Sequence, residues 1–352
     1  MLNSLRKKLG GNGDKGAPAG TDTADLRTRI DELTAANRES PSLEREREIL
    51  ALRHRLGAAL VREDRPAPED PIREFGGLNE EGLAVADAGD LDGALVRGGI
   101  LEHGYVYVPG MISREDALRV ADGIENAFAT RRGGDPDPRL YEEFLPEKPY
   151  GPVAGRAWIE AGGGLLAADS PALNFDVVEL FERIGLRKVI DQFLGEPATV
   201  SIQKTTLRKA DPGPAGGWHQ DGSFMGETRA LNVWVALSDC GVDAPGLEFV
   251  PRRIEDLLET GGEGSGVEGI EKPETDGVTA HEVLIGTRTA EDAGGEFGVV
   301  RPAFKAGDVM LFDDRFLHRT GSEPEMPNPR YAIESWFFGA SGFPKDYTPL
   351  AV

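Results

Sequence analysis

The feature that most constrains the fold is a series of short apolar runs between residues 199 and 338. The runs are Thr199–Arg208, Ala230–Leu237, Leu247–Val250, Gly298–Phe304, Asp308–Phe312 and Tyr331–Phe338. Turn signals such as Pro212-Gly213, Pro245-Gly246 and Gly307-Asp308 separate them. Because no helical pattern alternates with these runs, they predict an antiparallel sandwich or barrel, not a doubly wound parallel sheet.

The first 70 residues have a different pattern. Residues 1–22 are rich in glycine, lysine and aspartate, which is typical of a flexible leader. From residue 23 to about residue 63, apolar residues recur at helical spacing, with a break near Ser40-Pro41. Two helices are expected, and their apolar stripes either pack on the main domain or form a homodimer contact. The stripes consist of Leu26, Ile30, Leu33, Ile49, Leu52, Leu56 and Leu60.

These patterns predict three units: a leader over 1–22, a helical extension and linker over 23–70, and one main domain over 71–352. Pro66, Pro68 and Pro71 mark the linker. In the main domain we expect a short strand around 104–110, a helix capped by Ser113 and another helical stretch from Val177 to Phe193. The loop-rich segment 131–172 is expected to cover a site. A polar insertion at about 255–297 is expected to fold either as a lid or as an excursion from the barrel.

Composition narrows the function classes. The formal net charge of −22 argues against nucleic-acid and membrane-surface partners, because phosphate recognition requires a basic field. The single cysteine, Cys240, excludes an intramolecular disulfide framework and has no nearby histidine to activate it. Glycines follow the first lysines where a secretory signal has an apolar core, and no apolar run approaches 18 residues. A cytoplasmic protein without a membrane span is therefore expected.

The strongest chemical signal is His219-Gln220-Asp221, together with His318 about a hundred residues later. The pair alone is weak evidence, since five histidines and 61 acidic residues give about one chance match. In an extended segment, however, positions i and i+2 project to one side and can chelate one ion. Two imidazoles and one carboxylate on one side of a metal leave the other side open, as in non-haem Fe(II) oxygenases.

Several segments in order resemble the phytanoyl-CoA dioxygenase-like branch of the Fe(II)/2-oxoglutarate oxygenases. They are Gly104–Ser113, Trp218–Asp221, Leu231–Leu237, Gly246–Pro251, Gly307–Phe312 leading to His318, and Asn328–Tyr331. The resemblance covers roughly residues 95–342, whereas residues 1–90 and the insertion fall outside it. The ordered set is more specific than any one of its motifs.

The resemblance implies a mainly β fold, a double-stranded β-helix (a cupin-like jelly roll) with flanking helices and an N-terminal helical extension. His219, Asp221 and His318 would be the catalytic metal ligands that hold Fe(II). The co-substrates would be 2-oxoglutarate and O2, with the distal 2-oxoglutarate carboxylate on Arg330, assisted by Thr320. Other expected cofactor-binding residues are Gln203 and Asn232. Side chains alternate between the two faces of a strand, so residues 200–208 place Gln203 and Thr205 on one face and Lys204 and Arg208 on the other. If the face with Gln203 points inward, Lys204 faces solvent.

The implied activity is hydroxylation of a small-molecule metabolite or natural-product intermediate, with release of succinate and CO2. Desaturation, epimerisation and ring closure use the same machinery and are not distinguished. The alternative is a metal-binding jelly roll without oxygenase activity, either an isomerase or a 2-oxoglutarate sensor. Arg330 favours the oxygenase over the isomerase, because an isomerase does not require a carboxylate clamp there. The other histidines, His54, His103 and His281, lack a ligand partner at useful spacing and are expected to be ordinary polar residues.

Overall fold

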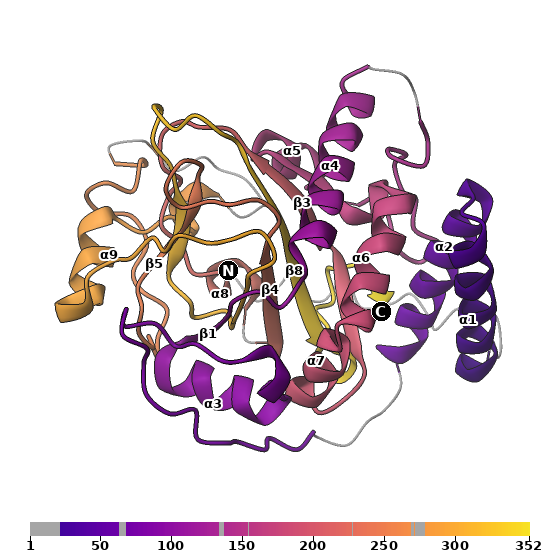
Figure 1. Ribbon diagram of the computed structural model, residues 1–352, viewed down its shortest axis with the longest axis horizontal. Coiled ribbons are helices and arrows are strands. Elements are labelled where there is room, and N and C mark those ends of the chain that lie inside the picture. Colours follow the sequence, from indigo (N-terminus) through magenta and orange to yellow (C-terminus); the bar gives the residue numbers. More distant parts are fainter. Residues whose placement is uncertain are drawn as a thin grey trace, which may run out of the picture.

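The computed structural model describes residues 22–62, 68–133, 137–153, 155–226, 228–268, 271 and 279–352. Almost all of the expected leader and parts of the linker and insertion therefore lie outside the described residues. The described chain contains a large and a small antiparallel sheet with helices around them (Figure 1). None of the helices that it forms is both long enough and apolar enough to cross a membrane.

The large sheet forms the centre of the molecule. Its strands follow the order β1 (Tyr105–Val108), β6 (Val309–Phe312), β4 (Ala230–Ala236), β8 (Arg330–Gly339), β3 (Ala198–Ala210) and β2 (Gly164–Leu166), and β9 (Pro349–Ala351) also pairs with β3. The pairing of β3 with β8 shifts register between Val200 and Thr205. Such an irregularity interrupts the alternation of side chains between the two faces.

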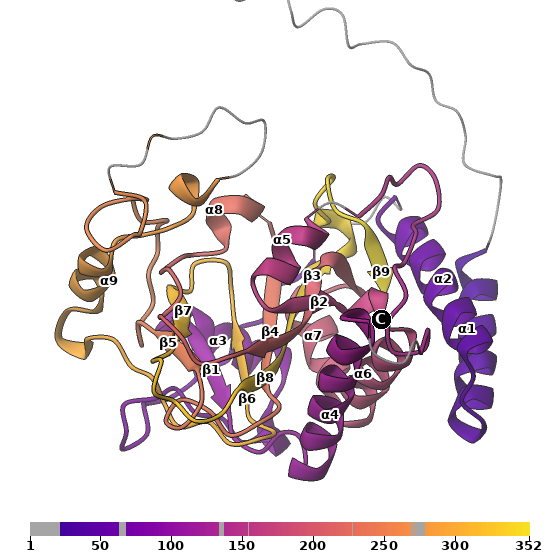
Figure 2. The ribbon, with the colours of Figure 1, turned by 90° about the horizontal axis from the view of Figure 1, so that it is seen from above.

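The two faces of the large sheet belong to different cores. Val233 and Ile333 lie in the core shared with helices. These helices are α3 (Gly93–His103), α4 (Arg114–Arg131), α6 (Pro171–Arg183) and α7 (Leu186–Leu194). Trp234 and Trp336 lie on the other face, in a core shared with Phe249 of the small sheet, which consists of β5 (Gly246–Phe249) and β7 (His318–Gly321). Figure 2 shows both sheets between α9 (Thr287–Gly294) on one side and the helices α1 (Thr23–Glu39) and α2 (Leu43–Leu60) on the other.

The two N-terminal helices, α1 (Thr23–Glu39) and α2 (Leu43–Leu60), confirm the predicted break at Ser40-Pro41. Their apolar stripes are buried in one cluster that also contains Ala340 and Ala351. In α2, a Cβ on Gly57 would lie 2.9 Å from the Ala351 backbone nitrogen, so glycine permits the close approach to β9. The stripes thus pack on the main domain, and a homodimer contact through them would have to displace this packing.

The helical stretch expected from Val177 to Phe193 is present as parts of two helices, because Gly185 (φ 74°) separates α6 from α7. Two other expectations about secondary structure are wrong. Residues 298–304 form isolated bridges at Val300 and Phe304 but no strand. Helices also contain more of the described residues than strands do, so the chain is not mainly β. The loop-rich segment 131–172 additionally contains α5 (Arg156–Ala161) and β2.

Replacing Leu56 with alanine is expected to destabilise the whole domain by about 2–5 kcal/mol, because a large-to-small change in a buried cluster leaves a cavity. Leu56 is only 3% exposed and lies where α2 meets the C-terminal strand. Urea unfolding followed by circular dichroism measures the loss, with Leu101→Ala as control because Leu101 is 47% exposed. Equal stabilities of the two variants would show that α1 and α2 do not stabilise the main domain.

Candidate metal centre

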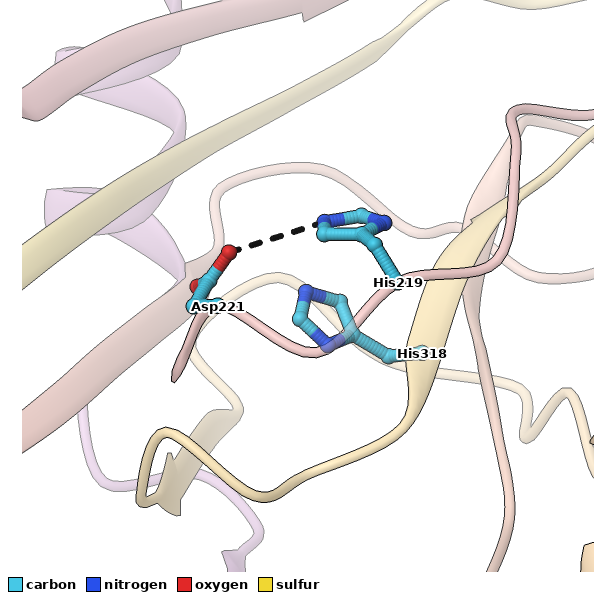
Figure 3. Close-up of side chains that lie close together, drawn as sticks. All are labelled: His219, Asp221 and His318. Atoms are coloured by element: carbon cyan, nitrogen blue, oxygen red, sulfur yellow. Dashed lines mark ion pairs between the residues drawn. The ribbon is translucent and has the colours of Figure 1, made fainter. Parts of the chain in front are cut away.

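His219, Asp221 and His318 converge in the structure although they are far apart in the chain (Figure 3). One potential ligand atom from each lies within 4.8 Å of the other two. The Nε2 atom of His219 is 3.7 Å from Oδ1 of Asp221, and the two imidazole centroids are 4.4 Å apart. Asp221 directly precedes the short helix α8 (Gly222–Met225), and His318 begins β7. The three side chains that the sequence singled out as metal ligands therefore lie close enough together to bind one ion.

The backbone fixes the two histidines relative to each other. The His219 N–H donates to the His318 carbonyl at 3.0 Å, and the His318 N–H donates to the His219 carbonyl at 3.1 Å. This reciprocal bridge joins the segment before α8 to the first residue of β7. The distance between the two imidazoles therefore does not depend on side-chain rotamers alone.

Each imidazole also has a fixed orientation. Nδ1 of His219 lies 3.0 Å from the Gly217 carbonyl, and Nδ1 of His318 lies 3.0 Å from the Phe316 carbonyl. A carbonyl only accepts, so each Nδ1 carries the proton and each Nε2 keeps its lone pair for a metal. Burial lowers the pKa of His318 to about 4, and the neighbouring His219 acts in the same direction. His318 is therefore neutral at pH 7, the form that ligates metals.

Trp336 orients the carboxylate of Asp221. Its Nε1–H donates to Oδ2 of Asp221 at 2.9 Å, in a buried environment. Oδ1 remains on the side of His219. Sequence analysis missed this residue, although Trp336 lies six positions after Arg330 and alternation therefore places both on the same face of β8.

Arg330 is a buried cation with unused donors. It is 3% exposed, and its Nε and Nη1 atoms have no hydrogen-bond partner among the described residues. Burial lowers its pKa to about 10, and the guanidinium carbon lies 5.8 Å from the centroid of the Trp234 ring. A buried charge without a partner is costly, so this site fits an anionic ligand that offers two oxygens.

Asn232 and Thr320, two other residues predicted to bind the co-substrate, lie on β4 and β7. Asn232 is fully buried, pairs in register with Trp336, and has no partner for either amide atom within the described chain. Thr320 follows His318 by two residues on β7, so both side chains point to the same side. Both residues therefore remain candidates for holding a ligand beside the triad.

Gln203 and Lys204 are placed differently from the expectation. The Gln203 amide oxygen accepts from the Thr348 N–H at 2.9 Å, and its nitrogen donates to the Thr348 hydroxyl at 3.2 Å. Gln203 is therefore engaged with the segment before β9 and not with the triad. Lys204 is half-buried and interacts electrostatically with Asp221, so it is not solvent-facing. The error lies in which face of β3 points inward. Leu207, on the same side of β3 as Thr205, lies in the core shared with the helices, whereas Lys204 and Arg208 lie towards the charges of Asp221 and Glu334.

Gln220, between two of the three triad residues, connects three segments. Its Nε2 donates to the Arg315 carbonyl at 2.6 Å and to the Asp256 carbonyl at 3.3 Å, and its Oε1 accepts from the Leu258 N–H at 2.8 Å. The side chain is 1% exposed, so these bonds are shielded from water. The start of the insertion and the loop before His318 are therefore tied to the triad segment.

Replacing Gln220 with leucine is expected to cost about 1–3 kcal/mol of stability, because buried carbonyls lose their donor. The Leu258 amide should then exchange hydrogen faster, and metal affinity should fall about 10–100-fold, as for other groups that orient ligands. Hydrogen-exchange mass spectrometry and metal titration measure the two effects. Gln203→Leu is the control, since it removes partly buried amide bonds to Thr348. The same metal affinity in both variants would contradict this role of Gln220.

The donor set of two imidazoles and one carboxylate is the one that non-haem Fe(II) oxygenases use. Residues 100–323 match the phytanoyl-CoA dioxygenase (PhyH) family. The chain belongs to this family, which confirms the resemblance drawn from the sequence.

Single proteins that resemble this chain share less than a third of its residues in the aligned regions. L-proline trans-4-hydroxylase from Streptomyces griseoviridis is 28% identical over 178 residues, which cover 47% of this chain and 64% of the hydroxylase. EctD from S. alaskensis, solved with 2-oxoglutarate and 5-hydroxyectoine, is 17% identical with a TM-score of 0.45, covering 81% of this chain and 90% of EctD. The epimerase SnoN, solved with Fe3+, alpha ketoglutarate and nogalamycin RO, is 20% identical with a TM-score of 0.40, covering 68% and 80%. These values indicate a distant likeness only.

Proposed function

We propose that this chain is an Fe(II)- and 2-oxoglutarate-dependent oxygenase that hydroxylates a small molecule and releases succinate and CO2. Two features together carry the proposal. His219, Asp221 and His318 converge, and Arg330 is buried on the face of β8 that also carries Trp336, with no partner for its Nε and Nη1 atoms among the described residues. The two sheets that enclose the triad would form the double-stranded β-helix expected from the sequence. Family membership and the relative that hydroxylates L-proline support this choice.

His219, Asp221 and His318 would hold the iron, and Arg330 would bind the distal carboxylate of 2-oxoglutarate through its planar fork. When bound, Fe(II) and 2-oxoglutarate supply the O2 activation that oxidises the substrate. The Gly217 and Phe316 carbonyls hold both imidazoles in the metal-binding tautomer. Phe316 also stacks on His318 with centroids 5.5 Å apart, which shields this ligand from water.

Oxygen insertion is favoured over halogen transfer. Halogenating relatives have a small residue where this chain has Asp221, so that chloride occupies the vacated metal position. Here the carboxylate is fixed by Trp336, and its negative charge disfavours a second anion at the same place. Turnover is therefore expected to proceed without chloride.

Succinate release from the anaerobically reconstituted protein, started with O2 in chloride-free buffer, tests the proposal. L-proline and related amino acids come first among the screened compounds, followed by larger metabolite pools. At least one compound should stimulate succinate release and gain oxygen, and a His318→Ala protein should show no stimulation. Background release with every compound, while iron and 2-oxoglutarate both bind, would instead favour a 2-oxoglutarate sensor.

A further inference from the structure

Lys204 is a second cation close to the triad. It lies on β3 next to Thr205, which pairs with Ser335, so Lys204 stands beside the part of β8 that contains Trp336. Its charge interacts with that of Asp221 and, more weakly, with those of Glu334 and Arg208. The side chain is half-buried. Lys204 therefore faces the end of the site where Asp221 is held.

The Lys204 ammonium lies against aromatic rings. Nζ lies 3.7 Å from the centroid of Phe224 and 5.8 Å from that of Tyr347. Phe224 belongs to α8, the helix that begins directly after Asp221. Tyr347 interacts electrostatically with Asp221. Within the described chain, Lys204 makes no ion pair or hydrogen bond. Cation–π contacts offset part of the cost of burial, but an ammonium has three donors that a ligand oxygen would satisfy.

The neighbouring charges do not neutralise Lys204. Arg208 has its own partner, because its Nε lies 3.6 Å from Glu334. Asp221 already accepts from Trp336 and would give its other oxygen to a bound metal. When a metal ion binds Asp221, the carboxylate charge is shared with the metal, and the positive charge of Lys204 is no longer balanced by a neighbouring carboxylate.

Lys204 is also distant from Arg330. Arg330 pairs with Ala210 on β3, six residues along the strand from Lys204, a backbone separation of ~20 Å at about 3.3 Å per residue. The Arg330 side chain lies against Trp234, whereas that of Lys204 lies against Phe224. The two cations therefore stand at opposite ends of the site and are suited to different anions.

We propose that Lys204, with Phe224 and Tyr347, binds an anionic group of the substrate, so that the oxidised small molecule carries a carboxylate or similar anion. This inference rests on the proposed function and specifies its substrate class. Arg330 then binds the co-substrate, and Lys204 holds the substrate on the other side of the triad. Phe224 and Tyr347 contribute an apolar surface beside the anion.

Acid and amide pairs of matched shape test this subsite. The probes are acetate, benzoate and N-acetyl-L-proline, each compared with its amide, and added anaerobically to protein loaded with Fe(II) and 2-oxoglutarate. Isothermal titration calorimetry measures each affinity. We expect the wild-type protein to bind at least one acid tenfold or more tightly than its amide, and Lys204→Gln to reduce that ratio to about one. Lys204→Arg should keep most of the preference, since the charge remains.

Lys345→Gln is the matched control, because Lys345 is an exposed lysine two residues before Tyr347, and it should leave the ratio unchanged. Iron and 2-oxoglutarate affinities, measured first, show that each variant is folded and loaded. No acid preference in the wild-type protein, or a preference that survives in Lys204→Gln, overturns the assignment. A selective loss of 2-oxoglutarate affinity in Lys204→Gln also overturns it, because the co-substrate would then occupy Lys204. Failure of the wild-type protein to bind iron or 2-oxoglutarate would refute the proposed function itself and this inference with it.

Discussion

Replacement of His318 with alanine is expected to abolish stoichiometric Fe(II) binding. His318 supplies one of the three donors that converge within the described part of the chain. Its neutral imidazole is held in place by the Phe316 carbonyl and by the backbone bridge to His219. The loss of affinity should exceed the roughly 10–100-fold effect of changes that only orient a ligand. Anaerobic equilibrium dialysis with iron analysis measures the effect.

His103→Ala is the control for this experiment. His103 ends α3 and lies 3.2 Å from the Gly76 carbonyl, outside the group of three donors. Its removal should leave one iron per chain. If His318→Ala bound iron as well as the His103 variant did, the metal centre would have to be built from other residues.

Replacement of Arg330 with alanine is expected to raise the 2-oxoglutarate requirement tens- to thousands-fold while sparing the iron. The loss of a bidentate, charge-assisted contact in a buried site costs about 2–5 kcal/mol. Arg330→Lys should recover only part of the affinity, because an ammonium is a point charge without the planar fork. Anaerobic 2-oxoglutarate titration of the iron-loaded protein measures both variants.

Arg288→Ala is the control for this experiment. It also removes a guanidinium, but from the surface, because the Arg288 side chain is 76% exposed. It should not change 2-oxoglutarate affinity. If Arg330→Ala retained iron and bound 2-oxoglutarate normally, another cation, first of all Lys204, would be the clamp. Loss of iron together with 2-oxoglutarate would instead indicate that Arg330 mainly supports the fold.

Local patterns predicted the strands and the triad because both depend on short-range geometry. Short apolar runs bounded by turn signals predicted β4, β6 and β8 within one or two residues of their observed bounds. The spacing of His219 and Asp221 brought both side chains to one place, as expected for positions i and i+2. The distant partner, His318, was found through the ordered resemblance and not through any local signal.

Features that depend on tertiary context could not be predicted in the same way. The apolar pattern of β3 does not specify which of its two faces points to the triad, so Lys204 lies near Asp221 whereas Gln203 bonds Thr348, the reverse of the expected roles. The hydrogen bond from Trp336 to Asp221 joins residues more than a hundred positions apart, so no spacing rule indicates it. The packing of α2 on β9 likewise depends on where the end of the chain returns, which the helical stripe alone does not specify.

The central claim is that His219, Asp221 and His318 hold an iron to which 2-oxoglutarate binds directly. The most direct measurement is the anaerobic visible absorption spectrum of the protein with Fe(II), before and after 2-oxoglutarate is added. We predict a new charge-transfer band that saturates at one equivalent of each and is absent from His318→Ala. Bound iron without such a band, or an equal band in His318→Ala, would contradict the claim.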